Sequence, residues 1–194
     1  LIGGIIQTSM YGCSLTWPFT AFSILLVYLN QKTQDISQDS LTKLNNRATL
    51  DKHLHYLFSD SKEKFGLILF DVNSFKSIND TYGHLNGDNA LSKLAAIMKM
   101  TFGETDSFLA RYGGDEFVAI IKNSTEESLK SYIVDINNAL DVFNTSKTIP
   151  FKLSVSSGYC MYPSEGIHTI KELIEKADVQ MYENKKAYHK SISN

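Results

Sequence analysis

The chain has 194 residues, of which 43% are hydrophobic, and its formal net charge is −2. That length accommodates one domain of ordinary size with an extension, and the hydrophobic fraction is ample for a core. The slight excess of acids excludes the strongly basic surface that a nucleic-acid backbone requires, so we expect no nucleic-acid partner.

Residues 1–30 contain no charged side chain and no histidine, and the first charge is Lys32. Within them, LTWPFTAFSILLVYL (15–29) is densely apolar with an aromatic residue near each end, which is typical of a membrane-spanning helix. A buried helix of a soluble protein is the alternative, because Pro18 and the early glycines weaken the pattern. We predict transmembrane segments at 1–30, as the end of a longer membrane region in a fragment, and a polar linker at 31–40.

From residue 41 to residue 190 we expect one folded domain in which helices alternate with strands. The apolar run FGLILF (65–70) predicts a buried central strand. The other expected elements are a helix over 46–58, a helix over 88–102, a helix opened by a Ser124–Glu127 capping box and ending near 143, a strand over 151–159, and a closing helix capped by Thr169 and Glu172 that runs to 186. This order predicts an α+β or mixed α/β fold.

Residues 111–117 read RYGGDEF, with short apolar runs on either side that indicate two strands of a hairpin. We expect Gly113 and Gly114 to supply the positive φ angles of a tight turn. The tip acids Asp115 and Glu116 could serve solubility alone. Alternatively, the bare glycine backbone admits a bulky ligand and the carboxylates hold a hard cation, as a phosphate ligand with Mg²⁺ would require.

Asp71 directly follows the predicted central strand, in the stretch FDVNSFKSINDTYGHLNGDNAL (70–91). If that strand pairs with the hairpin, Asp71 converges with Asp115 and Glu116 into an oxygen-rich site suited to Mg²⁺. Capping of the following helix is the alternative role for Asp71.

The residues after Asp71 suggest a nucleotide. Lys76 can meet a phosphate, while Asn79 and Asp88 offer the donor and acceptor groups that match the Watson–Crick edge of guanine. Adenine lacks the ring donor that a carboxylate would accept, so this set favours guanine. His84, next to Gly83, could instead be a simple turn residue.

Five segments in this order resemble the GGDEF family of diguanylate cyclases: DSLTKLNNR (39–47), residues 70–91, ARYGGDEF (110–117), LSVSSGY (153–159) and ADVQMYENKK (177–186). The resemblance implies an α/β (α+β) fold of the nucleotidyl-cyclase type, with a central mixed sheet flanked by helices. It also implies that a C₂ homodimer condenses two GTP into cyclic di-GMP and releases two pyrophosphates. A degenerate domain that binds GTP and regulates a partner without turnover is the competing hypothesis.

The resemblance also implies roles for individual residues. Asp71, the Val72 carbonyl and Asp115 would hold two Mg²⁺ ions, or Mn²⁺, with Asp115 as the catalytic base and Glu116 assisting. The residues implied to bind GTP are Lys76, Asn79, His84, Asp88, Gly113, Gly114, Lys185 and His189. A bacterial protein at the inner membrane, with this domain in the cytoplasm, completes the expectation.

The sequence departs from the family pattern in several places. Asn73 replaces an acid, Ser74 an aromatic residue and Lys43 a glycine, while His189 stands where a phosphate-binding Arg is expected and would weaken triphosphate binding. Many relatives carry an Arg-x-x-Asp product-inhibition site before the hairpin. Residues 104–107 read ETDS and lack the Arg, so we expect no inhibition by cyclic di-GMP through that site.

Overall fold

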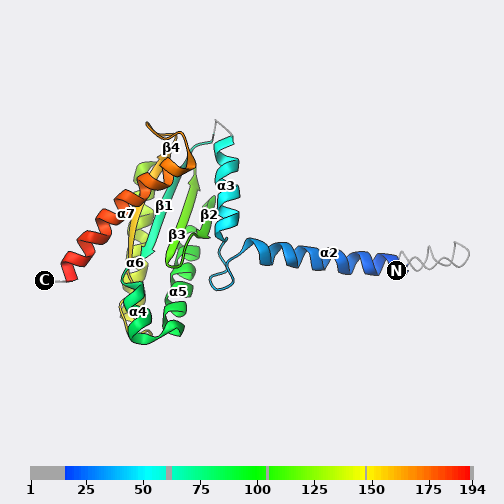
Figure 1. Cartoon of the computed structure of the whole chain (residues 1–194), viewed down its shortest axis with the longest axis horizontal. Helices are drawn as coiled ribbons and strands as arrows, with labels where there is room; N and C mark the ends of the chain where they lie inside the picture. The colour runs from blue at the N-terminus through cyan, green and yellow to red at the C-terminus, as the bar shows by residue number, and fades with distance from the viewer. Residues whose placement is uncertain (1–15, 60–62, 104, 147, 193–194) are drawn as a thin grey trace, which may run out of the picture. The chain divides into compact units, whose positions relative to one another are not determined.

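A computed structural model describes residues 16–59, 63–103, 105–146 and 148–192 (Figure 1). The chain divides into two compact units, Leu1–Gln38 and Asp39–Asn194. The described part of the first unit is a single helix, and the second unit holds a sheet with its covering helices.

The helix of the first unit, α2, spans Thr16–Ser37. It therefore includes residues 31–37, which were expected to form part of a polar linker. Its apolar side chains are exposed, among them Phe22, Ile24 and Val27. Within the described residues no helix is both long enough and apolar enough to cross a membrane, so the transmembrane segment predicted at 1–30 has no support there.

The second unit is built around a four-stranded sheet in the order β2-β3-β1-β4. Every strand pair is antiparallel, so the predicted mixed sheet is wrong. Its elements are α3 (Arg47–Ser59), β1 (Phe65–Val72), α4 (Phe75–Tyr82), α5 (His84–Phe102), β2 (Ser107–Arg111), β3 (Glu116–Lys122), α6 (Glu126–Thr145), β4 (Val155–Tyr162) and α7 (Ile170–Ile192).

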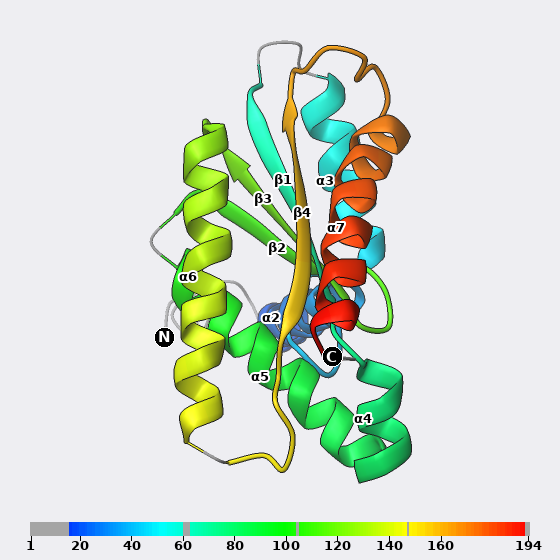
Figure 2. The same cartoon turned by 90° about the vertical axis from the view of Figure 1, so that its left-hand side faces the viewer.

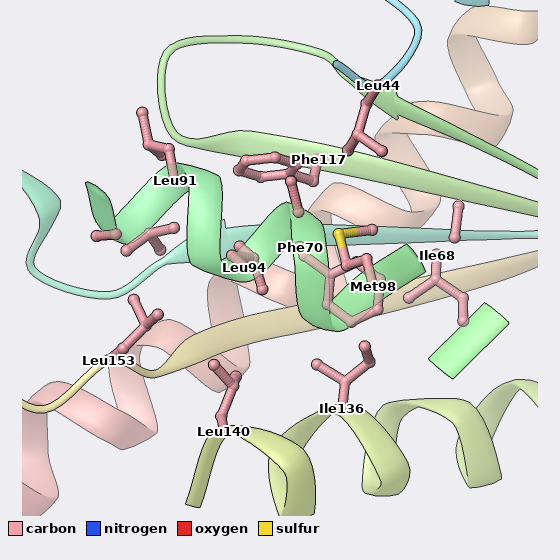
Figure 3. Close-up of a cluster of buried hydrophobic side chains, with 14 of the residues drawn as sticks. Leu44, Ile68, Phe70, Leu91, Leu94, Met98, Phe117, Ile136, Leu140 and Leu153 are labelled. Carbon is pink, nitrogen blue, oxygen red and sulfur yellow. The ribbon is translucent and has the colours of Figure 1, made fainter. Parts of the chain in front are cut away.

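Strand β1 is central, as predicted, and all of its residues are buried. Side chains alternate between the two faces of the sheet, so Ile68 and Phe70 join one hydrophobic cluster while Leu67 and Leu69 join the other. The first cluster lies against α5 and α6 (Figure 3), and the second lies against α3 and α7. Figure 2 shows the two helix pairs on opposite sides of the sheet.

Helix α7 lies close against β4, an edge strand. A Cβ atom at Gly158 would come within 2.1 Å of the Ala177 carbonyl oxygen, so only glycine permits this approach. Two α7 amides then satisfy the outer edge of β4: the Tyr159 N–H donates to Gln180 Oε1 (2.8 Å), and Asn184 Nδ2 donates to the Ser157 carbonyl (2.7 Å). These contacts fix the position of α7 along the strand.

Two helix starts test the predicted caps. The Thr169–Glu172 cap of α7 is confirmed, because Glu172 N–H donates to Thr169 Oγ1 at 3.2 Å. The predicted Ser124–Glu127 capping box is wrong by one residue. Thr125 and Ser128 form it instead, while the Ser124 hydroxyl donates to the Ile121 carbonyl and closes the preceding turn.

Lys43, which stands where the family pattern has glycine, lies in a turn between Asp39 and Leu44. Its φ angle of 56° places it in the left-handed region, which a side chain with a Cβ atom rarely adopts. The turn is closed by the Asp39 N–H donating to the Leu44 carbonyl at 2.8 Å. The structure therefore retains the backbone that glycine would favour, with a lysine in it.

Replacing Lys43 by glycine should raise the free energy of unfolding by about 0.5–1 kcal/mol, because it removes the strain of a left-handed lysine. Urea denaturation monitored by circular dichroism measures this change. The exposed helical residue Lys52 provides the control, since Lys52→Gly should lower the same quantity by about 1 kcal/mol. A Lys43→Gly variant less stable than the parent chain would contradict the argument.

Candidate active site

Two carboxylates lie opposite each other on neighbouring strands. In the β1–β3 register, Asp71 pairs with Glu116, which confirms that the two acidic segments lie side by side. Leu69 and Val118 face the α3–α7 side of the sheet, so alternation places Asp71 and Glu116 on that side as well. Asp71 is 6% exposed, and α7 covers this face of the sheet (Figure 2).

The hairpin loop from Tyr112 to Asp115 brings a third carboxylate to the end of β1. The Val72 N–H donates to the Asp115 carbonyl at 3.1 Å, and the Tyr112 N–H donates to the Glu116 carbonyl at 2.8 Å. Four residues connect the strands, so the loop does not need the mirror-image turn of a two-residue hairpin.

The two hairpin glycines serve a different purpose from the one predicted. Neither Gly113 nor Gly114 has a positive φ angle, so the expectation of a turn that demands glycine is wrong. A Cβ atom at Gly113 would lie 2.4 Å from Glu116 Oε2, whereas one at Gly114 would meet nothing within 4 Å. Gly113 therefore leaves room for the Glu116 carboxylate, and Gly114 leaves the exposed side of the loop open.

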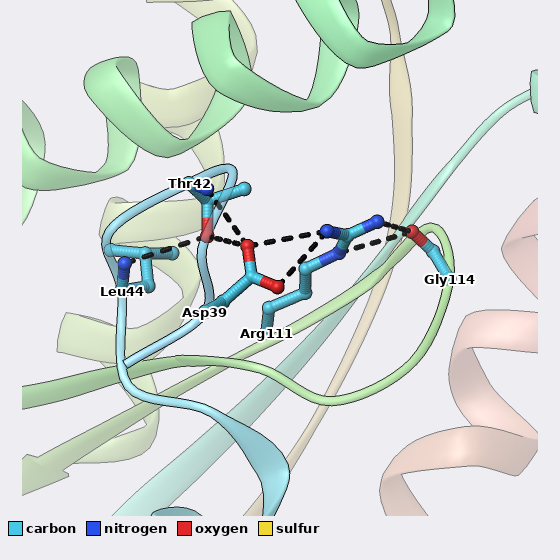
Figure 4. A network of polar contacts seen from close by, with 5 residues as sticks. All are labelled: Asp39, Thr42, Leu44, Arg111 and Gly114. Carbon is cyan, nitrogen blue, oxygen red and sulfur yellow. Dashed lines mark hydrogen bonds and ion pairs between the residues drawn. The ribbon is translucent and has the colours of Figure 1, made fainter. Parts of the chain in front are cut away.

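Arg111 ties the hairpin to the segment that begins the domain (Figure 4). Its Nη2 and Nε donate to the Gly114 carbonyl at 2.7 and 3.2 Å, and Nη1 donates to both carboxylate oxygens of Asp39 at 3.2 and 3.1 Å. Burial alone would raise the pKa of Asp39, but hydrogen bonds from Thr42 and the Arg111 charge together hold that pKa below its ordinary value. Arg111 thus holds the loop that carries Asp115 through the Gly114 carbonyl, and Asp39 holds Arg111 itself in place.

Lys185 of α7 supplies a cation to this acidic group. Its Nζ lies 2.7 Å from Asp71 Oδ1, and the side chains of Lys185 and Asp71 are 29% and 8% exposed. Position 189, where the family pattern has Arg, also lies on α7, but the His189 side chain is outside the described part of the chain. The predicted effect of His189 therefore stays a prediction.

Burial and neighbouring negative charges raise the pKa of two acids in this group. Burial, the largest influence, raises the pKa of Asp71, while the hydrogen bond and charge of Lys185 oppose the rise without cancelling it. Burial likewise raises the pKa of Glu116, and the charges of Asp71, Asp115 and Asp178 raise it further. The neighbouring carboxylate charges, rather than burial, are what would attract a cation to this group.

Replacing Glu116 by Gln should stabilise the fold at neutral pH. Because the folded chain holds the Glu116 proton more tightly than the unfolded chain, wild-type stability falls as pH rises from the unfolded pKa through the raised folded value. We expect Glu116→Gln to gain stability over wild type as pH is raised from about 4 to about 8, with no gain at the acidic end.

Urea unfolding of both chains across that pH range measures the difference. Glu165→Gln, at an exposed turn, removes one negative charge elsewhere and should show no comparable trend. An advantage for Glu116→Gln that grows on acidification would show that the sign is wrong.

The residues expected to read the base lie on the α4–α5 pair. The half-buried Asn79 packs on Gly87, where a Cβ atom would lie 2.0 Å from Asn79 Oδ1, and Asp88 is the next residue along α5. Lys76 on α4 and His84 at the start of α5 are exposed. Between described residues, no hydrogen bond or ion pair joins this group to the carboxylates, although α4 begins only three residues after Val72.

The donor atoms of this group decide which divalent metal it fits. Asp71, Asp115 and the Val72 carbonyl offer only oxygen, which suits Mg²⁺ or Mn²⁺. Across the described ranges, no three His, Cys, Asp or Glu side chains already surround a metal position. Mg²⁺ is commonly held by one or two carboxylates together with substrate phosphates, so the residues fit a metal that binds with a nucleotide.

Asn73 directs its side chain to the neighbouring strand. It is 2% exposed, its Oδ1 accepts a hydrogen bond from Ser156 Oγ at 2.6 Å, and its Nδ2 donates to Ser154 Oγ at 3.2 Å. This departure from the family pattern therefore joins β1 to β4. Ser74, the next departure, has a φ angle of 56° and precedes α4 without a side-chain cap.

Three residues of this region were missed in the sequence analysis: Asp39, Arg111 and Asp178. Asp39 and Arg111 lie within two of the five motif segments and carry opposite charges, which is a usable signal for an ion pair. Asp178 lies one residue into the segment ADVQMYENKK, and nothing in the sequence indicates that its charge reaches Asp71 and Glu116. The predicted absence of a product-inhibition site stays a prediction, since residue 104 is outside the described chain.

Comparison with known proteins identifies the family. Residues 36–191 match the family described as "Diguanylate cyclase, GGDEF domain", so the chain belongs to the GGDEF family. It is 30% identical over 162 residues to diguanylate cyclase A of Treponema denticola, covering 81% of this chain and 43% of that protein. It is 37% identical over 156 residues to the probable diguanylate cyclase DgcI of Escherichia coli, covering 80% and 32%. The chain thus spans less than half the length of these relatives.

A solved structure supports the fold. The coiled coil and GGDEF domain of DgcB from Caulobacter crescentus, solved in complex with c-di-GMP, superposes with a TM-score of 0.79. The match covers 89% of this chain and 93% of that one at 24% identity. The likeness confirms the α+β fold with helices on both faces of the sheet.

Proposed function

We propose that this domain is a diguanylate cyclase that joins two GTP molecules into cyclic di-GMP and releases two pyrophosphates. The observation that carries the proposal is the β1–β3 register, which sets Asp71 beside Glu116 and brings the loop of Asp115 to the same end of the sheet. Membership of the GGDEF family supports the same activity.

The proposed reaction is phosphoryl transfer performed twice. The 3′ oxygen of one GTP forms a bond to the α-phosphorus of the other, and the bond from that phosphorus to pyrophosphate breaks. Asp115 would accept the proton of the attacking hydroxyl, with Glu116 assisting. Repetition with the roles of the two nucleotides exchanged closes the ring.

Asp71, the Val72 carbonyl and Asp115 would hold two Mg²⁺ ions, or Mn²⁺. Bound metal would neutralise phosphate charge and lower the pKa of the attacking hydroxyl. The pKa of Glu116 is raised first by burial and then by the charges of Asp71, Asp115 and Asp178, and these neighbouring carboxylates support the assignment because they attract cations.

The proposed GTP contacts are assigned from the chemistry of each side chain and from its position in the fold. Asn79 and Asp88 would bind the guanine edge, and the packing of Asn79 on Gly87, the residue before Asp88, supports this. Phosphates would lie near the start of α4, where Ser74 makes no side-chain cap and a helix N-terminus favours anions. The remaining proposed contacts are Lys76, His84, Gly113, Gly114, Lys185 and His189.

Two GTP-loaded domains must meet, so we propose a C₂ homodimer. Each chain carries one group of acids, and the second chain would bring the second nucleotide to it. Attachment to a bacterial inner membrane through residues 1–30 stays a prediction, which separation of membrane and soluble cell fractions would test.

Incubating the dimerised chain with GTP and Mg²⁺, and resolving the products by chromatography, tests the activity. Asp115→Asn should lower the rate of product formation at least about a hundredfold, because it removes both the base and a metal ligand. Asp135→Asn, at an exposed position on α6, is the control for charge. A near-normal rate for Asp115→Asn would refute its role, and a wild-type chain that binds GTP without forming product would indicate the degenerate alternative.

Replacing Asp88 by Ser should weaken discrimination of GTP from ATP. Loss of a charged hydrogen-bond acceptor for guanine costs about 1–3 kcal/mol, while adenine has no matching donor to lose. Competition titrations with the two nucleotides measure the ratio of their affinities, with Asp135→Ser as the control. An unchanged ratio would remove Asp88 from the base site.

A further inference from the structure

Lys185 is held against Asp71 by a rigid support. The Lys185 Nζ to Asp71 Oδ1 distance is 2.7 Å, and the Asp71 side chain is 8% exposed. One turn earlier in α7 the Met181 side chain is buried, and Asn184, next to Lys185, donates to the Ser157 carbonyl at 2.7 Å. The close approach of α7 to Gly158 leaves the helix little freedom to shift. The ammonium group therefore sits at a defined place on the carboxylate.

The same two side chains have conflicting tasks in the proposed reaction. Asp71 is the proposed metal ligand, yet its Oδ1 is taken by an ammonium group. A divalent cation at that oxygen would face the Lys185 charge at close range, where like charges repel. Lys185 is also a proposed phosphate contact, so Asp71 and an incoming phosphate compete for the same positive charge.

We propose that Lys185 is a tethered counter-ion that occupies Asp71 until metal and nucleotide bind together, and then moves to the triphosphate. The inference rests on the proposed function for the identity of the metal ligand and of the nucleotide. Metal that binds alone at Oδ1 displaces the ammonium group from that oxygen without supplying a new anion for it. Metal with a triphosphate provides that ammonium group with a new anionic partner, so the site discriminates against metal without nucleotide.

The opposite signs of two effects distinguish this role from a simple phosphate contact. In the nucleotide-free full chain, Lys185→Met should tighten Mn²⁺ binding about tenfold, because one competing positive charge is removed. The same variant should bind GTP more weakly in the presence of Mn²⁺. Free Mn²⁺ measured by electron paramagnetic resonance gives the first quantity, and calorimetry with GTP gives the second.

Lys186 provides a matched control on the same helix. It is exposed, and its Nζ lies 4.2 Å from the centre of the Tyr182 ring, so Lys186→Met removes the same charge without touching Asp71. That variant should change Mn²⁺ affinity by less than about twofold, since an exposed charge is screened by salt. Lys185→Arg keeps the positive charge and should retain the weak Mn²⁺ binding of wild type.

A second measurement uses the wild-type chain and does not depend on how a variant folds. Acetylation of lysine amines, followed by mass spectrometry, should show faster labelling of Lys185 when Mn²⁺ is added, with Lys186 as the internal reference. Mn²⁺ binding that Lys185→Met leaves unchanged or weakens would overturn the inference, as would an unchanged Lys185 labelling rate or no Mn²⁺ binding by either chain. A chain that makes no cyclic di-GMP yet shows the predicted Mn²⁺ differences would refute only the proposed activity.

Discussion

The buried carboxylate at the end of the central strand is the constraint on which the rest of the site depends. Strand β1 is buried along its whole length and pairs on both sides, yet Asp71 lies in it. Burying a charge is costly unless it is paired, so a cation must reach this position from outside the sheet. Helix α7 is the element that meets this need, because it covers the face to which alternation directs Asp71.

The approach of α7 is in turn set by backbone contacts. Gly158 allows the helix to touch β4, and the Gln180 and Asn184 amides then fix the helix along the strand by hydrogen bonds to its edge. Lys185 follows directly after Asn184 in the chain. A glycine on an edge strand thus decides where a positive charge is placed relative to Asp71, with the hydrophobic cluster around Met181 supplying the stabilisation.

The sequence predicts those parts of the fold that depend on local pattern. The central strand, the hairpin and the helices over 46–58 and 88–102 follow from hydrophobic spacing, and the pairing of Asp71 with the hairpin acids follows from adjacent strands. Patterns read from single residues fail more often. The capping box was predicted one residue too early, because several Ser, Thr and Glu residues are clustered there. Gly113 makes room for the Glu116 side chain, which the rules for turns do not predict.

Long-range contacts lie beyond sequence patterns. The Asp71–Lys185 pair spans 114 positions of the chain and the Arg111–Asp39 pair spans 72, so neither has a local signal. The antiparallel sheet illustrates the same limit, because helices between strands are compatible with mixed and antiparallel pairing alike. Here the connections carry β3 and β4 to opposite sides of β1, each running antiparallel to it.

Two departures from the family pattern, at Lys43 and Asn73, affect residues around the acids and not the acids themselves. Lys43 adopts a glycine-like backbone conformation in the turn that begins the domain, and the Asn73 side chain is hydrogen-bonded to Ser156 of β4. Neither removes a carboxylate from the group formed by Asp71, Asp115 and Glu116. An Asn at position 73 also avoids adding another buried negative charge next to Asp71, whose pKa is already raised by burial. Among the described residues, Lys185 is the cation that contacts this group of acids, so a further buried carboxylate would need a further cation. Asn73 instead forms hydrogen bonds with Ser154 and Ser156 and adds no charge.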